Sequence, residues 1–341
     1  MRSFKEERMK FDLKIIIKGI LIALCIYIAA LLAVGFADRI LFEPKSIFAR
    51  TVKGFEEQKD QIQILFLGQS DMKYAIIPKA MPYPSYNFAE SGENFVATYF
   101  KLKYYIDKTP GLKIVVLPLN LTCFSTTRLE WVRGKHFPKY FSYGYITYED
   151  FRELYQLMGF KVVLKKMQSL FPFPDSRQMK TFWRNVGNLV RSKPIERSEI
   201  GDGYFKVSGG NVSEEYAREA VQHRFRKKYK FDEGSLTYFE KILVLCHSRG
   251  VKVVTLAMPV TDYYIKHAEK YVTNAALYER VVANPRFSPY IYRHIDCMDR
   301  YAKDHALFWN GDHLNFEGAT SFSKRVASEL SKIFEEMRKV S

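Results

Sequence analysis

The chain has 341 residues, 47% of them hydrophobic, which is enough for a packed core and excludes a wholly disordered protein. Its formal net charge is +16, and residues 1–18 contribute only +3 of this, so the rest of the chain is itself basic. Such a charge favours anionic partners, namely phospholipid headgroups, an acidic glycan or nucleic acid, although a solvated basic surface is the alternative. Nucleic acid is the least favoured, because no zinc-finger cysteine pairs, RNP-like aromatic motif or helix-turn-helix pattern occurs in the sequence.

The cysteines and aromatic residues predict packing rather than metal chemistry. The four cysteines, at positions 25, 123, 246 and 297, form no Cys-x-x-Cys pair and have no matching histidine spacing, so we expect no metal site and no cofactor. Core packing is the prediction for each of them. The 23 Tyr and 27 Phe suit either a thick core or a groove that stacks against sugar rings.

The first predicted element is a membrane anchor. Residues 19–36 read GILIALCIYIAALLAVGF, an uncharged apolar run that follows a basic tail at 1–18. A helix of this length can cross a bilayer core of about 30 Å. The basic tail should stay in the cytoplasm, which places the rest of this single-pass protein outside. A cleavable signal peptide with a small-x-small site at 33–35 is the alternative, but the run exceeds the roughly 7 to 15 apolar residues typical of such peptides.

The remainder predicts a linker at 37–59 and one α/β domain at 60–341, because no repeat, low-complexity tract or long inter-domain linker is present. Short apolar runs predict strands, and amphipathic stretches between them predict helices. Alternating strands and helices indicate a parallel sheet covered on both faces. The segment 126–230 breaks the rhythm and is interpreted as a mostly helical insertion. The predicted strands are 62–67, 113–119, 251–258 and 290–297; the predicted helices are 94–108, 235–249, 262–284 and 318–339, with helical patches at 148–170 and 213–229 in the insertion.

The first candidate motif for chemistry is a strand that ends in Gly-x-Ser. Residues 64–71 read ILFLGQSD, which places Ser70 just after a buried strand. Ligand sites of open α/β sheets lie at the carboxyl ends of strands, and a helix that starts there presents amide N–H groups to an oxyanion. A serine at this place is also an ordinary helix N-cap, and without further support that reading is favoured.

The second candidate motif lies just before the last predicted helix. Residues 310–319 read NGDHLNFEGA and contain His313. A histidine in such a loop can take a proton from a serine, and a neighbouring carboxylate can hold its tautomer. As an isolated His-Asp pair the motif is weak, and its strength comes from being combined with Ser70 at the other end of the domain.

The order of these motifs resembles the SGNH (GDSL-type) hydrolase superfamily, especially its membrane-anchored bacterial branch, which is related to cell-envelope polysaccharide O-acyltransferases and the teichoic-acid D-alanylation protein. Further matching stretches are YNFAESG at 86–92, VVLPLN at 115–120 and VTLAMP at 254–259. The resemblance covers about residues 60–335 except the insertion. It implies a three-layer α/β/α, flavodoxin-like fold with a parallel sheet.

The resemblance also implies roles for single residues. Ser70 would be the nucleophile and His313 the general base, and Gly92 and Asn120 would join the Ser70 amide as oxyanion-hole donors. The sequence departs from the family pattern at Gln69, where Asp is usual, and at Asn310, where the aspartate that orients the histidine is usual. An amide can accept a hydrogen bond from the imidazole but brings no charge to stabilise the imidazolium; Asp312 is the carboxylate that could substitute.

Two functions follow from this resemblance. The first is a serine esterase or O-acyltransferase that acts on a cell-envelope polysaccharide or another anionic polymer through an acyl-Ser70 intermediate, with an integral-membrane acyltransferase as a partner. Hydrolysis and transfer share the acyl-enzyme step and differ in what attacks it, so both are retained. The second is a noncatalytic binding or assembly subunit with the same fold, which Asn310 favours.

Overall fold

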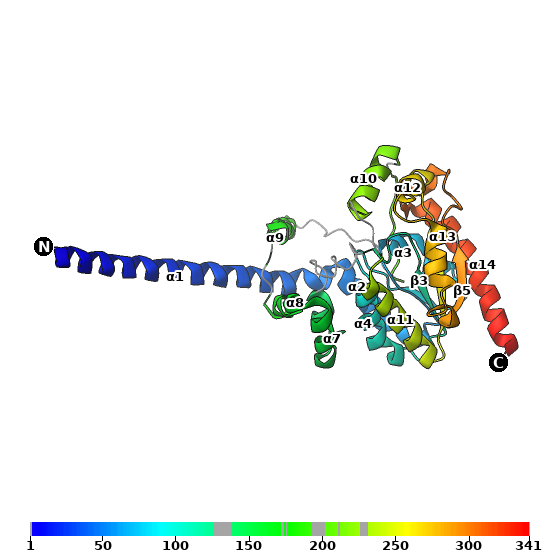
Figure 1. Ribbon diagram of the computed structural model, residues 1–341, viewed down its shortest axis with the longest axis horizontal. Coiled ribbons are helices and arrows are strands. Elements are labelled where there is room, and N and C mark those ends of the chain that lie inside the picture. Colours follow the sequence, from blue (N-terminus) through cyan, green and yellow to red (C-terminus); the bar gives the residue numbers. More distant parts are fainter. Residues whose placement is uncertain are drawn as a thin grey trace. The chain divides into compact units, whose positions relative to one another are not determined.

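The computed structural model describes residues 2–125, 138–171, 174, 176–191, 202–210, 212–225 and 231–340 (Figure 1). The fold class predicted from the sequence is confirmed at the level of an α/β protein with a parallel sheet. Five parallel strands are hydrogen-bonded in the order β2-β1-β3-β4-β5. They are β1 (Ile64–Phe66), β2 (Ser85–Asn87), β3 (Ile114–Pro118), β4 (Lys252–Ala257) and β5 (Ile291–Asp296), and a separate antiparallel pair consists of β6 (Phe308–Asn310) and β7 (His313–Leu314).

The described α-helices fall where the amphipathic stretches predict them, with several exceptions. Helix α4 and helix α11 lie side by side in Figure 1, and the long α14 closes the chain. The helices are α1 (Arg2–Leu41), α2 (Ile47–Gln58), α3 (Ser70–Ala75), α4 (Phe95–Tyr105), α6 (Pro138–Ser142), α7 (Tyr148–Met158), α8 (Phe160–Leu170), α9 (Ser176–Val190), α10 (Glu214–Phe225), α11 (Glu233–Ser248), α12 (Asp262–Ala268), α13 (Asn274–Leu277) and α14 (Phe316–Val340).

Alternate residues of the strands belong to two different hydrophobic clusters. Leu65 and Val115 point into one cluster, together with residues of α2, α4 and α11. Phe66 and Val116 point into the other, together with residues of α3 and α14. Side chains that follow each other along a strand face opposite sides, so both sides of the sheet carry apolar core, as expected for buried parallel strands.

The structure differs from the sequence-based expectation in three helical segments. The stretch 262–284 is not one helix but α12, then α13 and a π-helical turn over Tyr278–Val282. The patch at 148–170 is two helices, because Gly159 has a φ of 58° and ends α7. The expected linker at 37–59 contains α2, whose Phe48, Val52 and Phe55 are buried in the core at helical spacing.

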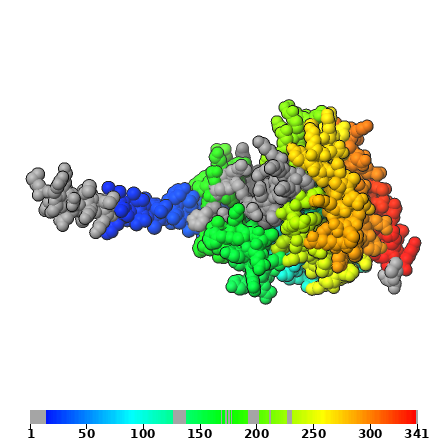
Figure 2. All heavy atoms as spheres, viewed as in Figure 1, coloured from blue at the N-terminus to red at the C-terminus, as the bar shows by residue number. Residues whose placement is uncertain are grey.

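The chain divides into two compact units, one formed by Met1–Ser46 and Met167–Arg197, the other by Ile47–Lys166 and Ser198–Ser341. The first unit contains the predicted anchor. Within Ile15–Lys45 lies the one described helix that is long and apolar enough to cross a membrane, and only 6% of its apolar window is buried. A core helix of a soluble protein would be covered, whereas the side chains of α1 shown in blue in Figure 2 are bare.

A buried ion-pair cluster fixes the helix that begins with Ser70. Lys73 of α3 donates to Glu90 Oε2 at 2.7 Å, and Lys139 Nζ lies 3.1 Å from Glu90 Oε1. Burial alone would raise the pKa of the Glu90 carboxyl, but the charges and hydrogen bonds of Lys139 and Lys73 outweigh this and lower its pKa from 4.5 to about 2. Because the folded-state pKa is depressed, the pair contributes stability that is complete above about pH 4.5 and is lost as pH falls toward 2.

We predict that Glu90→Gln lowers the free energy of unfolding by roughly 3 to 5 kcal/mol near neutral pH, because two buried ammonium groups lose their counter-ion. The difference from the natural protein should shrink as pH falls from 4.5 toward 2. Urea unfolding of the full chain in detergent, followed by circular dichroism at several pH values, measures both effects. The matched control is Glu57→Gln, whose side chain is 62% exposed and pairs loosely with Lys53. A loss no larger than that of the control would contradict the prediction.

Candidate active site

A close backbone approach positions Ser70 at the carboxyl end of β1. Gly68 has a φ of 126°, and a Cβ there would lie 2.5 Å from Pro118 Cγ, so only glycine lets the chain turn past the end of β3. Two residues later Ser70 begins α3. The serine hydroxyl is therefore presented at the edge of the sheet where parallel strands end and ligands bind.

His313 reaches the same edge from the other end of the domain. It opens β7, directly after the turn that joins it to β6. The turn is tied down at Gly311, whose carbonyl oxygen accepts hydrogen bonds from the backbone N–H and the hydroxyl of Thr261, both at 3.0 Å. The imidazole is nearly buried, with the rings of Tyr74 and Trp309 at centroid distances of 5.4 and 6.0 Å.

Ser70 and His313, 243 positions apart in the sequence, are joined by a hydrogen bond. Ser70 Oγ lies 2.8 Å from His313 Nε2, within the distance expected for a nucleophile and its base. On the other side of the ring, His313 Nδ1 lies 2.9 Å from Asn310 Oδ1. That oxygen also accepts the backbone N–H of Asp312 at 3.1 Å, which identifies it as the acceptor end of the amide. Nδ1 therefore carries the proton, and Nε2 is left to accept the proton of Ser70.

The carboxylate of Asp312 supplies a charge beside the imidazole, and an arginine offsets that charge. Asp312 Oδ1 lies 3.1 Å from His313 Nδ1 but makes no hydrogen bond of good geometry with the described residues. Asp312 Oδ2 forms an ion pair with Arg224 of α10. Asn310 thus holds the position of the ring, while the negative charge near it is shared between His313 and Arg224.

Helix α10, from the insertion, packs directly on this loop. A Cβ at Gly311 would lie only 3.2 Å from Cβ of Ala217, so glycine is what allows α10 to lie so close. Val221 and Phe225 of the same helix are buried in a third hydrophobic cluster, which also contains Tyr264. The insertion is therefore part of the site and not only a decoration of the sheet.

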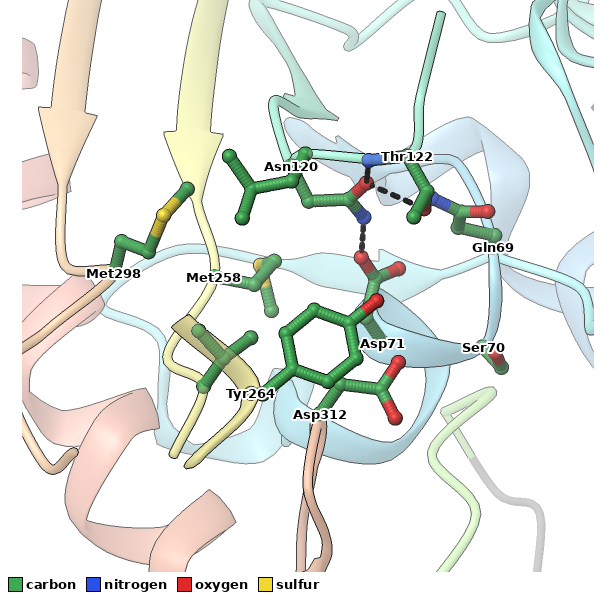
Figure 3. Close-up of a pocket in the computed structure, with 11 residues that line it drawn as sticks. Gln69, Ser70, Asp71, Asn120, Thr122, Met258, Tyr264, Met298 and Asp312 are labelled. Atoms are coloured by element: carbon green, nitrogen blue, oxygen red, sulfur yellow. Dashed lines mark hydrogen bonds between the residues drawn. The ribbon is translucent and has the colours of Figure 1, made fainter. Parts of the chain in front are cut away.

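A pocket beside Ser70 has one polar and one apolar side (Figure 3). Asn120 donates its side-chain amide hydrogen to Asp71 Oδ2, and its Oδ1 accepts from the backbone and the hydroxyl of Thr122, both at 3.0 Å. These bonds fix the amide with its NH₂ directed at the pocket, and the second hydrogen of that group can serve an oxyanion. The apolar lining consists of Leu121, Met258, Val260, Tyr264 and Met298.

The structure does not bring every sequence-predicted residue to the pocket. Ser70, Asp312 and Asn120 line it, whereas Gly92, His313 and Asn310 are not among the described residues that do. His313 reaches the pocket only through its hydrogen bond to Ser70. Gly92 has a φ of 75°, which fits the turn residue that it could be instead of a donor. Gln69, at the departure from the family pattern, lines the pocket and donates to Cys123 Sγ at 3.5 Å.

Sequence reasoning missed Asp71 and Arg224. Asp71 is nearly buried and follows Ser70 directly, so its position at the start of a helix next to the candidate nucleophile was an available signal. Arg224 lies in the insertion, far from either motif, and only the packing of α10 brings it to the site. Within the described part of the chain, no group of three or more His, Cys, Asp or Glu side chains could hold a metal ion.

Comparison of the sequence with models of protein families gives no match. Comparison with curated proteins gives no significant match either. The chemistry of the site must therefore be argued from its own geometry.

We predict that Arg224→Gln and Asp312→Asn move the acidic limb of the pH profile of kcat/KM in opposite directions. Without Arg224, the Asp312 carboxylate would stabilise the imidazolium more strongly, so the acidic limb should move to higher pH. In Asp312→Asn, which lacks the carboxylate, the acidic limb should move to lower pH. Initial rates on an activated ester across the pH range measure both shifts.

The double variant Arg224→Gln/Asp312→Asn separates charge from packing. If Arg224 acts through Asp312, the double variant has the acidic limb of Asp312→Asn alone. A loss of rate in Arg224→Gln with an unmoved pH profile would instead assign Arg224 a purely structural role.

Proposed function

We propose that the protein is a serine esterase or O-acyltransferase that acts on a cell-envelope polysaccharide or a related anionic polymer. The observation that carries the proposal is the 2.8 Å hydrogen bond from Ser70 to a His313 whose far nitrogen is held by Asn310. This arrangement matches the general logic of an activated nucleophile, in which a base contacts the hydroxyl and a third group orients the base.

In the proposed reaction His313 Nε2 removes the Ser70 proton as Oγ attacks the carbonyl carbon of an ester. The oxyanion faces the backbone N–H of Ser70 and the amide of Asn120, and the imidazolium lies beside the Asp312 carboxylate. His313 then protonates the leaving alkoxide, which leaves an acyl group on Ser70. Attack by water gives hydrolysis, and attack by a sugar hydroxyl gives transfer.

The fold supports assignment to the SGNH superfamily and its three-layer arrangement. The strand order 2-1-3-4-5 is one of the common orders of doubly wound sheets, and such sheets bind ligands where their parallel strands end. Apolar clusters on both sides of the sheet are what layers of helices on each face require. The nucleophile follows the first strand and the base precedes the last helix, as the resemblance implies.

The location suits an envelope polymer. We infer that residues 19–36 are a retained anchor with the basic tail in the cytoplasm and the domain outside. An integral-membrane acyltransferase that delivers the acyl group is the partner that transfer would require.

We predict that the protein stays with the membrane during alkaline carbonate extraction and that protease added to intact spheroplasts digests its carboxyl-terminal domain. An apolar helix holds the chain in the bilayer, and the positive flank keeps the domain outside. Immunoblots against each end of the chain score both results. Release into the soluble fraction would indicate a cleaved signal peptide. Protection of the carboxyl-terminal domain from protease would indicate the opposite orientation, with that domain in the cytoplasm.

A noncatalytic assembly subunit with the same fold is the second candidate, and the observation that favours it is Asn310. The amide accepts the Nδ1 hydrogen but contributes no charge to the imidazolium. Arg224 forms an ion pair with Asp312 and so offsets part of its negative charge. Asp312 therefore stabilises an imidazolium at His313 less than the aspartate of a triad would.

We predict that a fluorophosphonate probe modifies Ser70 in the full-length protein and that Ser70→Ala abolishes both labelling and esterase activity. Asn310→Asp should raise kcat roughly tenfold, equivalent to about 1.4 kcal/mol of barrier. An Asp-to-Asn change in a serine protease triad lowers kcat by about 10⁴, and this is the upper limit here, since Asp312 already supplies part of the charge. Peptide mapping of the labelled protein and rates on a small activated ester measure these effects.

The same assay decides between the two candidates. An inert Ser70 in both the natural protein and Asn310→Asp, with unchanged unfolding curves, would assign the noncatalytic role. Ser91→Ala is the matched serine control, because that hydroxyl contacts Tyr74 at 3.2 Å and is not in reach of His313 by any described hydrogen bond.

A further inference from the structure

The unit that contains the predicted anchor also contains a second apolar surface. Helix α9 and the residues at the end of α8 each expose large hydrophobic side chains, and we call these two sets of side chains together the α8–α9 surface. Water-exposed apolar groups on this scale mark a surface that is covered by something else. The α8–α9 surface consists of Met167, Leu170, Phe171, Trp183, Leu189 and Val190, which are 42 to 80% exposed.

Two contacts attach this surface to α1 just after its apolar run. Arg39 of α1 donates to the carbonyl oxygen of Ser169 at 2.8 Å, and the ring of Phe42 packs edge-on against Phe182 of α9 at 5.7 Å. At 1.5 Å per residue, Arg39 lies about 4.5 Å and Phe42 about 9 Å beyond Phe36, the end of the run. If the run spans the hydrocarbon core, Arg39 falls within the headgroup layer, which is roughly 5 to 8 Å thick, and Phe42 lies at about the outer edge of that layer.

The composition of α9 suits that depth. The helix has no acidic residue, and Lys180 and Arg184 are exposed on it beside Trp183. A helix that lies in the plane of a membrane combines apolar side chains with basic ones, and tryptophan is enriched at this level because its ring is apolar while its N–H is polar. Basic side chains add attraction to anionic lipids.

We propose that the α8–α9 surface lies in the headgroup region of the bilayer, against anionic lipid, where α1 leaves the membrane. The occupant is the lipid surface, because the contact at Arg39 holds α8, and the contact at Phe42 holds α9, next to a helix that would itself be embedded in lipid. This inference rests on α1 spanning the membrane, and it is independent of the acyl chemistry proposed for Ser70.

Depth-dependent fluorescence quenching tests the proposal with the full chain in vesicles of phosphatidylcholine and phosphatidylglycerol. Trp131→Phe/Trp309→Phe leaves Trp183 as the only tryptophan, and Trp131→Phe/Trp183→Phe leaves Trp309 as the matched control. Lipids brominated near the headgroup end of the acyl chains should remove at least about half of the Trp183 emission, since an interfacial ring touches the bromines. The emission of Trp309, which is 38% exposed beside His313, should change little.

A charge test uses Lys180→Gln/Arg184→Gln in the Trp183-only protein. Quenching should weaken in vesicles that contain phosphatidylglycerol and should be unaffected by the substitutions in pure phosphatidylcholine, because the lost attraction is to anionic headgroups. Lys53→Gln, a change at an 80% exposed lysine outside this unit, is the matched control and should leave quenching unchanged.

Three outcomes would overturn the proposal. Trp183 could be quenched by aqueous iodide and not by brominated lipid, which would place the surface in water. It could be shielded in native membranes but not in pure lipid vesicles, which would make the occupant a protein. Failure of the protein to float with the vesicles would show that α1 is not a membrane anchor, on which the proposal rests. Fluorophosphonate labelling of Ser70 tests the proposed acyl chemistry separately.

Discussion

The hydrogen bond between Ser70 and His313 depends on how the chain holds the β6–β7 turn at the carboxyl edge of the parallel sheet, since His313 itself lies outside that sheet. β1 delivers Ser70 to that edge through a glycine that passes within contact of Pro118, and the turn before β7 delivers His313. Neither segment could reach the other by local structure, since 243 positions separate them. The parallel sheet therefore places Ser70, and the hydrogen bonds from Thr261, which follows β4, to the carbonyl oxygen of Gly311 hold the turn that places His313.

Buried ion pairs hold the start of α3, and with it Ser70, at the edge of the sheet. Glu90 binds Lys73 one turn after Ser70, and behind it the fully buried Lys101 is paired with Glu93 at 2.6 Å. Burial opposes the charged form of Lys101 and lowers its pKa, while the carboxylate of Glu93 opposes that shift. Separating the members of such a pair would leave an isolated buried charge, which costs free energy. A displacement of α3 would separate Lys73 from Glu90, so this ion pair holds the helix in place. The short helix that begins with Ser70 needs this support, because six residues do not make a stable helix on their own.

Much of the fold could be predicted from the sequence, and so could the pairing of Ser70 with His313. The predicted strands 113–119 and 251–258 contain β3 and β4, and only their ends differ from the prediction. Short apolar stretches rich in β-branched residues favour strands. The prediction of a single helix over 262–284 is wrong. Its apolar residues recur with a helical period, but the segment between α12 and α13 is not helical. The helix α2 could have been found from the spacing of Phe48, Val52 and Phe55. Arg224 could not, since its role comes from where α10 packs and not from any pattern around it.

The departure at Asn310 becomes more informative once the side chains around it are known. The aspartate of a serine–histidine–aspartate triad combines two tasks, orientation of the imidazole and stabilisation of its charge. Here the tasks are divided: Asn310 orients the ring, and Asp312 carries the charge at 3.1 Å while it also pairs with Arg224. Because Arg224 belongs to the insertion, a displacement of α10 would change how much of that charge reaches His313 without moving the nucleophile. The same insertion contains α9, which packs against α1, so one segment of the chain contributes both to the candidate active site and to the unit that contains the candidate membrane helix.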